Sequence, residues 1–327
     1  MPPNRAADSI RPIDPSDLDS AALLLAERHR RHRLAEPLLD PAYENPAATR
    51  REIEALLGGD QAQGWVAIRD GRVGAYLIGI AKTELVWGRN VWVEAAGHAA
   101  EDPALVRDLY AVAAGAWVDE GRTNHHVLVP ATDAGMVDAW FTLDFGQQHV
   151  QAVVDAPPAS FGVVPRSEVI VRAATLDDVP ALVQLGHVLP LHLARSPVFS
   201  RLPIERDQEL EAEARADLID PTYQFYIAEH DGRVIGVSVA CSLEVSSGSI
   251  GLSRPDHAGY LAHAAVLPTA RGLGAGRALG DAVLAWSRDH GYRSVVTDWR
   301  STNIEADRAW RGMGFRPTFR RLHRAII

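Results

Sequence analysis

One segment has residue types that clearly suggest chemistry. In it, Arg271 is directly followed by three glycines at alternate positions, Gly272, Gly274 and Gly276. An apolar run at 264–267 precedes them, and apolar residues recur at helical spacing over 279–290. Glycines at a helix start allow positive φ angles and expose successive N–H groups. These groups, the positive end of the helix dipole and the guanidinium together attract phosphate. The sequence therefore predicts a strand, a phosphate-binding loop and a helix.

Phosphate-binding loops differ in the residues that accompany their glycines. Loops of nucleotide hydrolases end in Gly-Lys-Ser/Thr, which does not occur here. The dinucleotide motif G-x-G-x-x-G requires a third glycine where this sequence has Arg277 or Leu279, although Asp298 stands where a ribose-binding acid is expected. The pattern V-x-P-x-x-R-G-x-G-x-G is complete, with Val266 and Pro268 in its first slots. It resembles motif A of the GNAT superfamily of acyl-CoA-dependent N-acyltransferases.

A second segment carries the same resemblance. It fits the GNAT pattern N-x-x-A-x-x-x-Y-x-x-x-G-F at all but one position, with Asn303, Ala306, Trp310, Gly314 and Phe315. In many GNAT proteins the tyrosine of this pattern protonates the departing CoA thiolate. Trp310 stands in that slot here, and an indole N–H donates a hydrogen bond but is not a useful acid. The resemblance therefore implies CoA binding without a protein acid at this position.

Landmarks of the first half of the chain recur in the second. The recurring pairs are Asp70-Gly and Asp231-Gly, Trp140 and Trp310, and Phe145 and Phe315. Each Asp-Gly stands between two apolar strands and predicts a hairpin turn. Because the repeat spans a whole domain, we expect a duplication: a degenerate N-terminal GNAT-like domain at 1–155, a linker at 156–166 and a catalytic GNAT domain at 167–327. This architecture resembles that of tandem GNAT proteins such as mycothiol synthase.

The two halves differ at the loop. The residues of the first half that align with the Arg-Gly-Gly-Gly set are Asp102, Pro103, Leu105 and Arg107. A carboxylate repels pyrophosphate and a proline lacks an N–H donor, so we expect the first half to keep the fold without the phosphate site. Degenerate CoA binding is the alternative. The predicted fold class is α/β: two tandem GNAT domains, each a mixed, mostly antiparallel twisted sheet flanked by helices.

The resemblance implies direct transfer of an acyl group from acetyl-CoA, as co-substrate, to a primary amine of a small molecule. The residues that it implies in cofactor binding are Val266, Arg271, Gly272, Leu273, Gly274, Ala275, Gly276, Arg277 and Asn303. Two residues are candidates for removing the proton of the amine: Asp298, shortly before Asn303, and His263, on the strand before the loop. Acceptor contacts are expected from 182–206, where the polar candidates are His187, His192 and Arg195.

Composition excludes several other tasks. The formal net charge of -9 argues against binding a nucleic-acid backbone, and no apolar run is long enough to span a membrane. The chain begins without an apolar signal region and has one cysteine, Cys241, so we expect a cytoplasmic location. The histidines lack a spacing that completes a metal-ligand set, so no metal is expected. Oligomeric state and acceptor identity stay open.

Two alternatives belong to other functional classes. A nicotinamide dehydrogenase is disfavoured by the missing third glycine and by the pattern at 303–315. A non-catalytic acyl-CoA-binding sensor or interaction protein stays open because Trp310 replaces the usual tyrosine. Turnover of any amine would exclude the sensor.

Overall fold

The computed structural model describes residues 6–84, 86–158, 168–200, 204–246 and 251–327. The chain divides into two compact units. Unit 1 comprises Met1–Val150, Ile250–Arg254 and Pro317–Ile327, and unit 2 comprises Gln151–Ser249 and Pro255–Arg316. Each unit is an α/β structure.

The sheet of unit 1 is mixed and mostly antiparallel. Its strands, in spatial order, are β1 (Ser9–Pro12), β2 (Ala62–Arg69), β3 (Arg72–Glu84), β4 (Gly88–Val93), β6 (Asn124–Pro130) and β13 (Arg316–Ala325), and β5 (His98–Ala100) also pairs with β3. β4 and β6 are parallel, and β13 pairs antiparallel with β6 from Phe319–Pro130 to Ala325–Asn124. The last strand of the sequence therefore belongs to the unit that contains the first.

Helices bury apolar side chains against this sheet in two clusters. The helices are α1 (Leu18–Ala35), α2 (Pro46–Leu57), α3 (Pro103–Asp119) and α4 (Ala134–Phe141). One cluster contains Trp117 of α3 and Trp140 of α4, both almost fully buried. The other contains Leu25 of α1 and Phe319 of β13. Trp140 and Trp310, the pair of tryptophans that marked the repeat in the sequence, are therefore both buried, with exposed fractions of 0% and 8%.

The sheet of unit 2 repeats the same plan. In spatial order its strands are the part of β7 (Gly146–Asp155) from residue 151 on, β12 (Ser294–Arg300), β11 (Ala258–Val266), β10 (Arg233–Ser242), β9 (Tyr223–His230) and β8 (Ile170–Ala173). β11 and β12 are parallel, whereas β8, β9, β10 and β11 are joined by antiparallel pairs.

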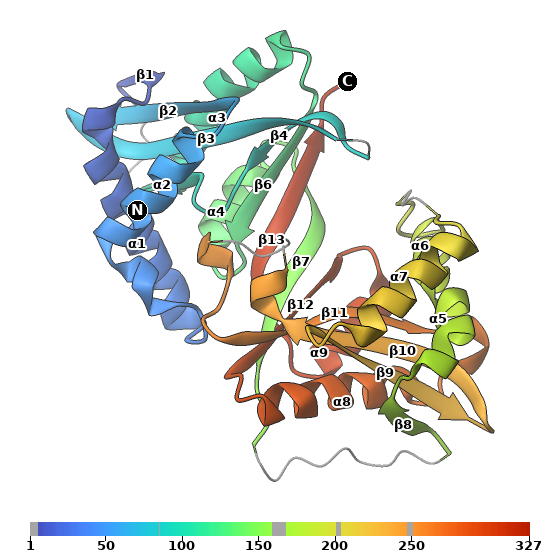
Figure 1. Ribbon diagram of the computed structural model, residues 1–327. Coiled ribbons are helices and arrows are strands. Elements are labelled where there is room, and N and C mark those ends of the chain that lie inside the picture. Colours follow the sequence, from blue (N-terminus) through green and yellow to red (C-terminus); the bar gives the residue numbers. More distant parts are fainter. Residues whose placement is uncertain (1–5, 85, 159–167, 201–203, 247–250) are drawn as a thin grey trace. The chain divides into compact units, whose positions relative to one another are not determined.

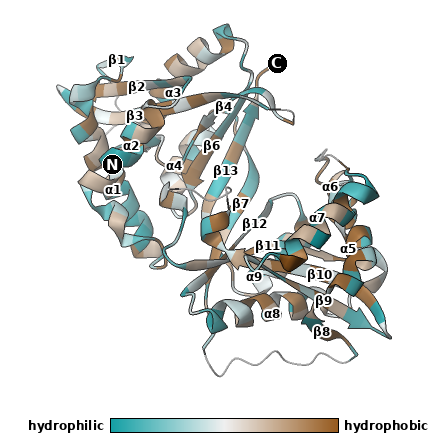
Figure 2. Ribbon diagram, in the orientation of Figure 1, coloured by the Kyte–Doolittle hydropathy of each residue, from teal (hydrophilic) through white to brown (hydrophobic). Residues whose placement is uncertain are grey.

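Helices cover both faces of this sheet. They are α5 (Val179–Gly186), α6 (Val188–Leu193), α7 (Asp207–Ile219), α8 (Ala275–Asp289) and α9 (Ile304–Gly312). Figure 1 shows α8 along one face and α5, α6 and α7 over the other. On β9 the neighbouring residues Ile227 and Ala228 point to opposite faces, toward Leu182 of α5 and Leu279 of α8 respectively. The strands between these helices are predominantly hydrophobic (Figure 2), as burial on both faces requires.

The predicted Asp-Gly hairpins are present in both units. Asp70 and Gly71 have φ angles of 52° and 76° between β2 and β3, and Asp231 and Gly232 have 49° and 69° between β9 and β10. Two successive positive φ angles match the right-handed twist of the flanking strands, which explains why Asp-Gly recurs at both turns.

The compact units differ from the domain boundaries predicted along the chain. The predicted division 1–155 and 167–327 assigns β7 wholly to the first half and β13 to the second. In the structure, unit 2 takes residues 151–155 of β7 and unit 1 takes residues 317–327. Most of the predicted linker, 156–166, lies outside the described residues. The roles assigned to the two halves stay predictions.

Candidate active site

The glycine-rich loop adopts the backbone that the sequence predicted. Gly272 and Gly274 both have φ of 85°, and Gly274 forms the left-handed N-cap of α8. A side chain at either position would be strained, because L-residues rarely adopt this conformation. α8 then begins at Ala275 and ends before Gly291, whose φ is 76°. The loop is therefore shaped to present N–H groups at a helix N-terminus.

β11 leaves part of its backbone open beside this loop. It pairs with β12 only from Ala258–Ser294 to Tyr260–Val296, although both strands continue. Beyond that point Thr297 Oγ1 donates to the carbonyl of Leu261 at 3.0 Å. The strands therefore separate toward the loop. The backbone up to Val266 is available to pair with an extended ligand such as the pantetheine arm of CoA.

A cavity of about 410 Å³, the loop cavity, lies between this open strand, the loop and α9. Most of the residues implied in cofactor binding line it: Val266, Arg271, Gly272, Gly274, Ala275, Gly276 and Asn303. Leu273 is exposed in the loop, and Arg277 lies in α8, where its Nε donates to Asp281 at 2.8 Å. The structure thus brings seven of the nine residues to one cavity.

Polar side chains connect the mouth of the loop cavity. Arg271 donates to Glu305 Oε1 at 2.8 Å and its other amino group lies 3.3 Å from Nδ1 of His192. Nε2 of His192 is 3.2 Å from Oδ1 of Asn303, and that oxygen also caps α9 by accepting from Ala306 N at 3.3 Å. His192, expected to contact the acceptor, therefore lines the loop cavity instead.

Trp310 also lines the loop cavity. Its indole is 8% exposed and packs edge to face on Phe315, with ring centroids 6.0 Å apart. Gly280 of α8 lies beside it and makes room for Met313, because a Cβ at Gly280 would lie only 2.5 Å from the methyl carbon of Met313. The side chain is thus both a wall of the cavity and part of the core.

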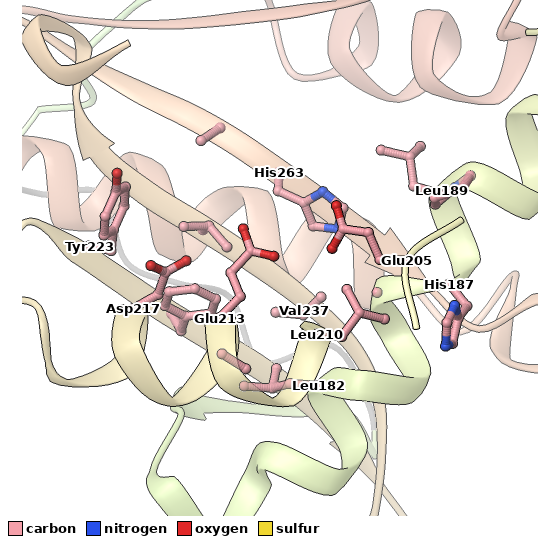
Figure 3. Close-up of a pocket in the computed structure, with 16 residues that line it drawn as sticks. Leu182, His187, Leu189, Glu205, Leu210, Glu213, Asp217, Tyr223, Val237 and His263 are labelled. Carbon is pink, nitrogen blue, oxygen red and sulfur yellow. The ribbon is translucent and has the colours of Figure 1, made fainter. Parts of the chain in front are cut away.

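A second cavity, of about 470 Å³, lies between α5, α7 and the strands β9, β10 and β11. Three carboxylates line it, so we call it the acidic cavity: Glu205, Glu213 and Asp217. Figure 3 shows Glu213 and Asp217 projecting from α7 and His263 from β11 into this space. His187, an expected acceptor contact, also lines it and hydrogen-bonds to Asp207.

His263 reaches the acidic cavity because of a bulge in β11. Val239 of β10 pairs with His263 and Ala240 pairs with Leu261, so Ala262 is an extra residue. Ala262 and His263 line the acidic cavity, whereas the next residues, Ala264 and Ala265, line the loop cavity. Burial lowers the pKa of His263, because desolvation disfavours the imidazolium. The neutral imidazole is therefore the stable form near pH 7.

Asp298 occupies a different environment. It is partly buried on β12 and accepts a 2.6 Å hydrogen bond from the hydroxyl of Tyr260. Burial and the nearby carboxylate raise the pKa of Tyr260, so this hydroxyl stays protonated. Asp298 is not among the lining residues of either cavity. Its catalytic role stays a prediction, and the geometry accounts for it as a hydrogen-bond acceptor.

Comparisons with known proteins agree with this geometry. The sequence model of the acetyltransferase (GNAT) family matches residues 191–315. The GCN5-related N-acetyltransferase from Sphaerobacter thermophilus superposes on 97% of this chain and 95% of its own, with a TM-score of 0.57 and 15% identity. A GCN5-related glucosamine N-acetyltransferase region of a fungal multi-domain β-N-acetylglucosaminidase covers 96% of this chain and 38% of its own, with a TM-score of 0.52 and 12% identity.

Within the second half of the chain, residues 191–315 match the GNAT family model, which supports the GNAT resemblance there. At such low identities the two structures show the fold alone, and they confirm the predicted fold class over nearly the whole chain. One curated relative, the aminoglycoside N(6')-acetyltransferase type 1 of Stenotrophomonas maltophilia, is 44% identical over 62 residues. That match spans 19% of this chain and 40% of the relative's length. The likeness to mycothiol synthase stays a prediction.

In the first GNAT-like unit, side chains occupy the position that corresponds to the open backbone of β11. The buried guanidinium of Arg28 donates to the carbonyls of Ala95 and His98, between β4 and β6. His98 Nε2 also lies 2.9 Å from the carbonyl of Leu128 on β6. Burial lowers the pKa of Arg28 to about 10, so the group remains charged at pH 7. Side chains of the chain itself thus satisfy the backbone that a pantetheine arm would contact.

The helix start of the first unit carries a carboxylate. Asp102 caps α3 by accepting from Ala104 N at 3.0 Å, and it forms an ion pair with Arg69 at 3.1 Å. Leu105, which aligns with Gly274, is completely buried in the core. A carboxylate and a core side chain therefore occupy the positions at which the GNAT loop of unit 2 exposes N–H groups.

Sequence reasoning missed the carboxylates of α7. Expected acceptor contacts ended at residue 206, directly before this helix begins at Asp207. The composition of α7 is typical of a solvent-exposed helix, and none of its side chains is buried. Only the packing of α7 beside α5 and β9 turns one of its faces toward a cavity.

Proposed function

We propose that this chain transfers an acyl group, expected to be acetyl, from CoA to a primary amine of a small molecule by direct attack. The observation that carries the proposal is the arrangement of the two cavities along β11. Leu189 lines both cavities. On β11, His263 lines the acidic cavity and the next residue, Ala264, lines the loop cavity. A thioester held in the loop cavity and an amine held in the acidic cavity would then meet at this strand.

The chain's own residues would bind the pyrophosphate, bind the pantetheine arm and accept the proton of the ammonium group. The N–H groups of the loop and the Arg271 guanidinium hold the pyrophosphate, and the open backbone of β11 up to Val266 holds the pantetheine arm. His263 accepts a proton from the ammonium group. The amine then forms a bond to the acyl carbon while the carbon–sulfur bond breaks, and the thiolate takes a proton from solvent or from the nascent ammonium. Trp310 forms a wall beside the thioester.

The structure favours His263 over Asp298 as the base. His263 faces the acidic cavity and is predominantly neutral at pH 7, whereas the Asp298 carboxylate accepts the Tyr260 hydroxyl. The first unit, whose strand opening is filled by Arg28, has a packing and substrate-shaping role in this proposal.

Acetyl-CoA with a panel of primary amines tests the proposal, with thiol release as the signal. We expect turnover with at least one amine, and turnover excludes the alternative of a non-catalytic acyl-CoA sensor, which Trp310 in the tyrosine slot favours. Acetyl-CoA binding without turnover of any amine would support that sensor instead. The structure has no helix, among the residues that it describes, long and apolar enough to cross a membrane. We propose a cytoplasmic location on the sequence arguments.

A further inference from the structure

The three carboxylates of the acidic cavity lack a basic partner. Among the described residues, neither Glu205, Glu213 nor Asp217 forms an ion pair with a lysine, arginine or histidine. Other carboxylates of the same helix are paired: Glu209 with Arg206, and Glu211 with Arg215 at 2.9 Å. The unpaired carboxylates that line the cavity are therefore Glu213 and Asp217 of α7 and Glu205, which precedes that helix.

This concentration of negative charge is unfavourable in the free protein. Partial desolvation raises the pKa of Glu213 although its side chain is exposed, and repulsion by Glu205 and Asp217 raises it further. Burial also raises the pKa of Asp217, with a contribution from Asp220. A cation bound between these groups would relieve the repulsion and replace lost hydration.

His263 does not supply that cation. Its imidazole lines the same cavity, and within the part of the chain that the structure describes it makes no hydrogen bond. Desolvation of the ring disfavours its charged form. An enclosed nitrogen that is free to accept a proton thus faces the same space as the carboxylates. Positive charge in this cavity has to come from the ligand.

We infer that the acceptor is a small molecule with at least two ammonium groups, of which one loses its proton to His263 and reacts while another is bound by Glu213 and Asp217. The inference rests on the proposed function and names its substrate class. The cavity, at about 470 Å³, has the size of a site for a small molecule. An acceptor with a carboxylate near its amine would be repelled.

A matched pair of acceptors tests this inference directly. We would measure kcat/KM with acetyl-CoA for α,ω-diaminoalkanes of increasing length and for amino alcohols in which a hydroxyl replaces the distal amine. The expected result is a preference for the diamine of about tenfold or more at the best length, the typical effect of one charged hydrogen bond. Equal values for diamine and amino alcohol at every length would overturn the inference.

Variants identify the residues responsible. Glu213→Gln and Asp217→Asn should each reduce the ratio of the two kcat/KM values by about tenfold. Glu211→Gln is the control, because Glu211 lies on the same helix but pairs with Arg215 and does not line the cavity. Since α7 buries none of its side chains, these substitutions should leave the fold intact. A ratio that changes as much in Glu211→Gln as in Glu213→Gln would contradict the assignment.

Failure of the inference and failure of the proposed function give different results. Turnover of monoamines and diamines alike keeps the function and overturns the inference. If no amine is turned over, the proposed function fails, and calorimetry with the best-fitting diamine still decides the inference. Binding that Glu213→Gln weakens would support a diammonium site, and absence of binding to the unmodified protein would overturn it.

Discussion

At the scale of single residues, the environment of His263 determines how this site would handle a proton. The residue sits on the strand bulge and faces the acidic cavity, and burial holds its pKa below the ordinary 6.5. A lowered histidine pKa means that the neutral, proton-accepting form persists to more acidic pH. The acidic limb of the pH–rate profile, on which the rate rises as His263 loses its proton, should therefore have its midpoint below the ordinary histidine value.

Replacing His263 tests this assignment. His263→Gln should lower kcat by roughly 10²–10⁴, the usual contribution of a general base, and should remove the histidine limb from the pH–rate profile. Acetyl-CoA affinity should stay unchanged, because the ring lines the acidic cavity and not the loop cavity. Asp298→Asn provides the comparison. If that variant loses the limb and His263→Gln keeps it, the sequence-based alternative is right.

Trp310 carries a second residue-scale prediction. Because its indole lines the loop cavity and is 8% exposed, Trp310→Phe should retain most of the turnover with acetyl-CoA. Trp310→Ala should destabilise the unit by about 3–5 kcal/mol, as large-to-small substitutions of buried aromatic residues do. Turnover would be compared at matched folded fraction, measured by circular dichroism. A hundredfold loss in Trp310→Phe with CoA binding intact would show that the indole N–H has a catalytic role.

At the scale of elements, we expect the loop and α8 to bind an anion together. Gly274 is at once the left-handed N-cap of α8 and a wall of the loop cavity. The same helix start in the first unit carries Asp102 and the core residue Leu105. The two helix starts therefore differ in several residue types, and the loop of unit 2 keeps the glycines that the first unit lacks.

Gly274→Asp should abolish acetyl-CoA binding, because it places a carboxylate and a strained side chain where the pyrophosphate would lie. Calorimetry should give one site per chain for the unmodified protein and none for the variant. Gly71→Asp is the matched control: Gly71 has φ of 76° and open space around it, but lies in the hairpin between β2 and β3. Two equal acetyl-CoA sites in the unmodified protein would contradict the expectation that the first unit does not bind CoA.

At the scale of the whole molecule, the units are not continuous stretches of sequence. β13 comes last in the chain, yet its Phe319 and Leu322 are completely buried in the clusters of unit 1. Leu252, from the segment before β11, also belongs to a cluster of unit 1. The first half of the sequence therefore does not contain all the residues of the core of unit 1.

Substitutions of two phenylalanines test whether β13 belongs to unit 1. Phe319→Ala should destabilise unit 1 by about 3–5 kcal/mol and speed amide exchange in β6, with which its strand pairs. Phe315→Ala removes a side chain of the same type, 3% exposed, from unit 2. It should speed exchange in unit 2 first. Hydrogen exchange measured by mass spectrometry compares the two. Faster exchange confined to β12 in Phe319→Ala would contradict the assignment of β13 to unit 1.

The sequence by itself determined the features that depend on local geometry. Asp-Gly specified both hairpins, because few residues tolerate two successive positive φ angles. The glycines of the loop and the helical spacing after them specified the anion-binding loop and α8, because backbone conformation and a nearby dipole suffice. The GNAT pattern then named the family, and seven of its nine cofactor residues share one cavity.

Only the tertiary structure decided which distant side chains meet. Glu213 and Asp217 resemble any exposed helical carboxylates until α7 packs beside the sheet, and His263 reaches them through a bulge that no local pattern announces. Arg28 lies on a helix far away in the sequence from the backbone carbonyl of His98, to which it donates in the first unit. The division of β7 and β13 between the units is equally non-local, because strand pairing depends on which edges are free after both sheets form.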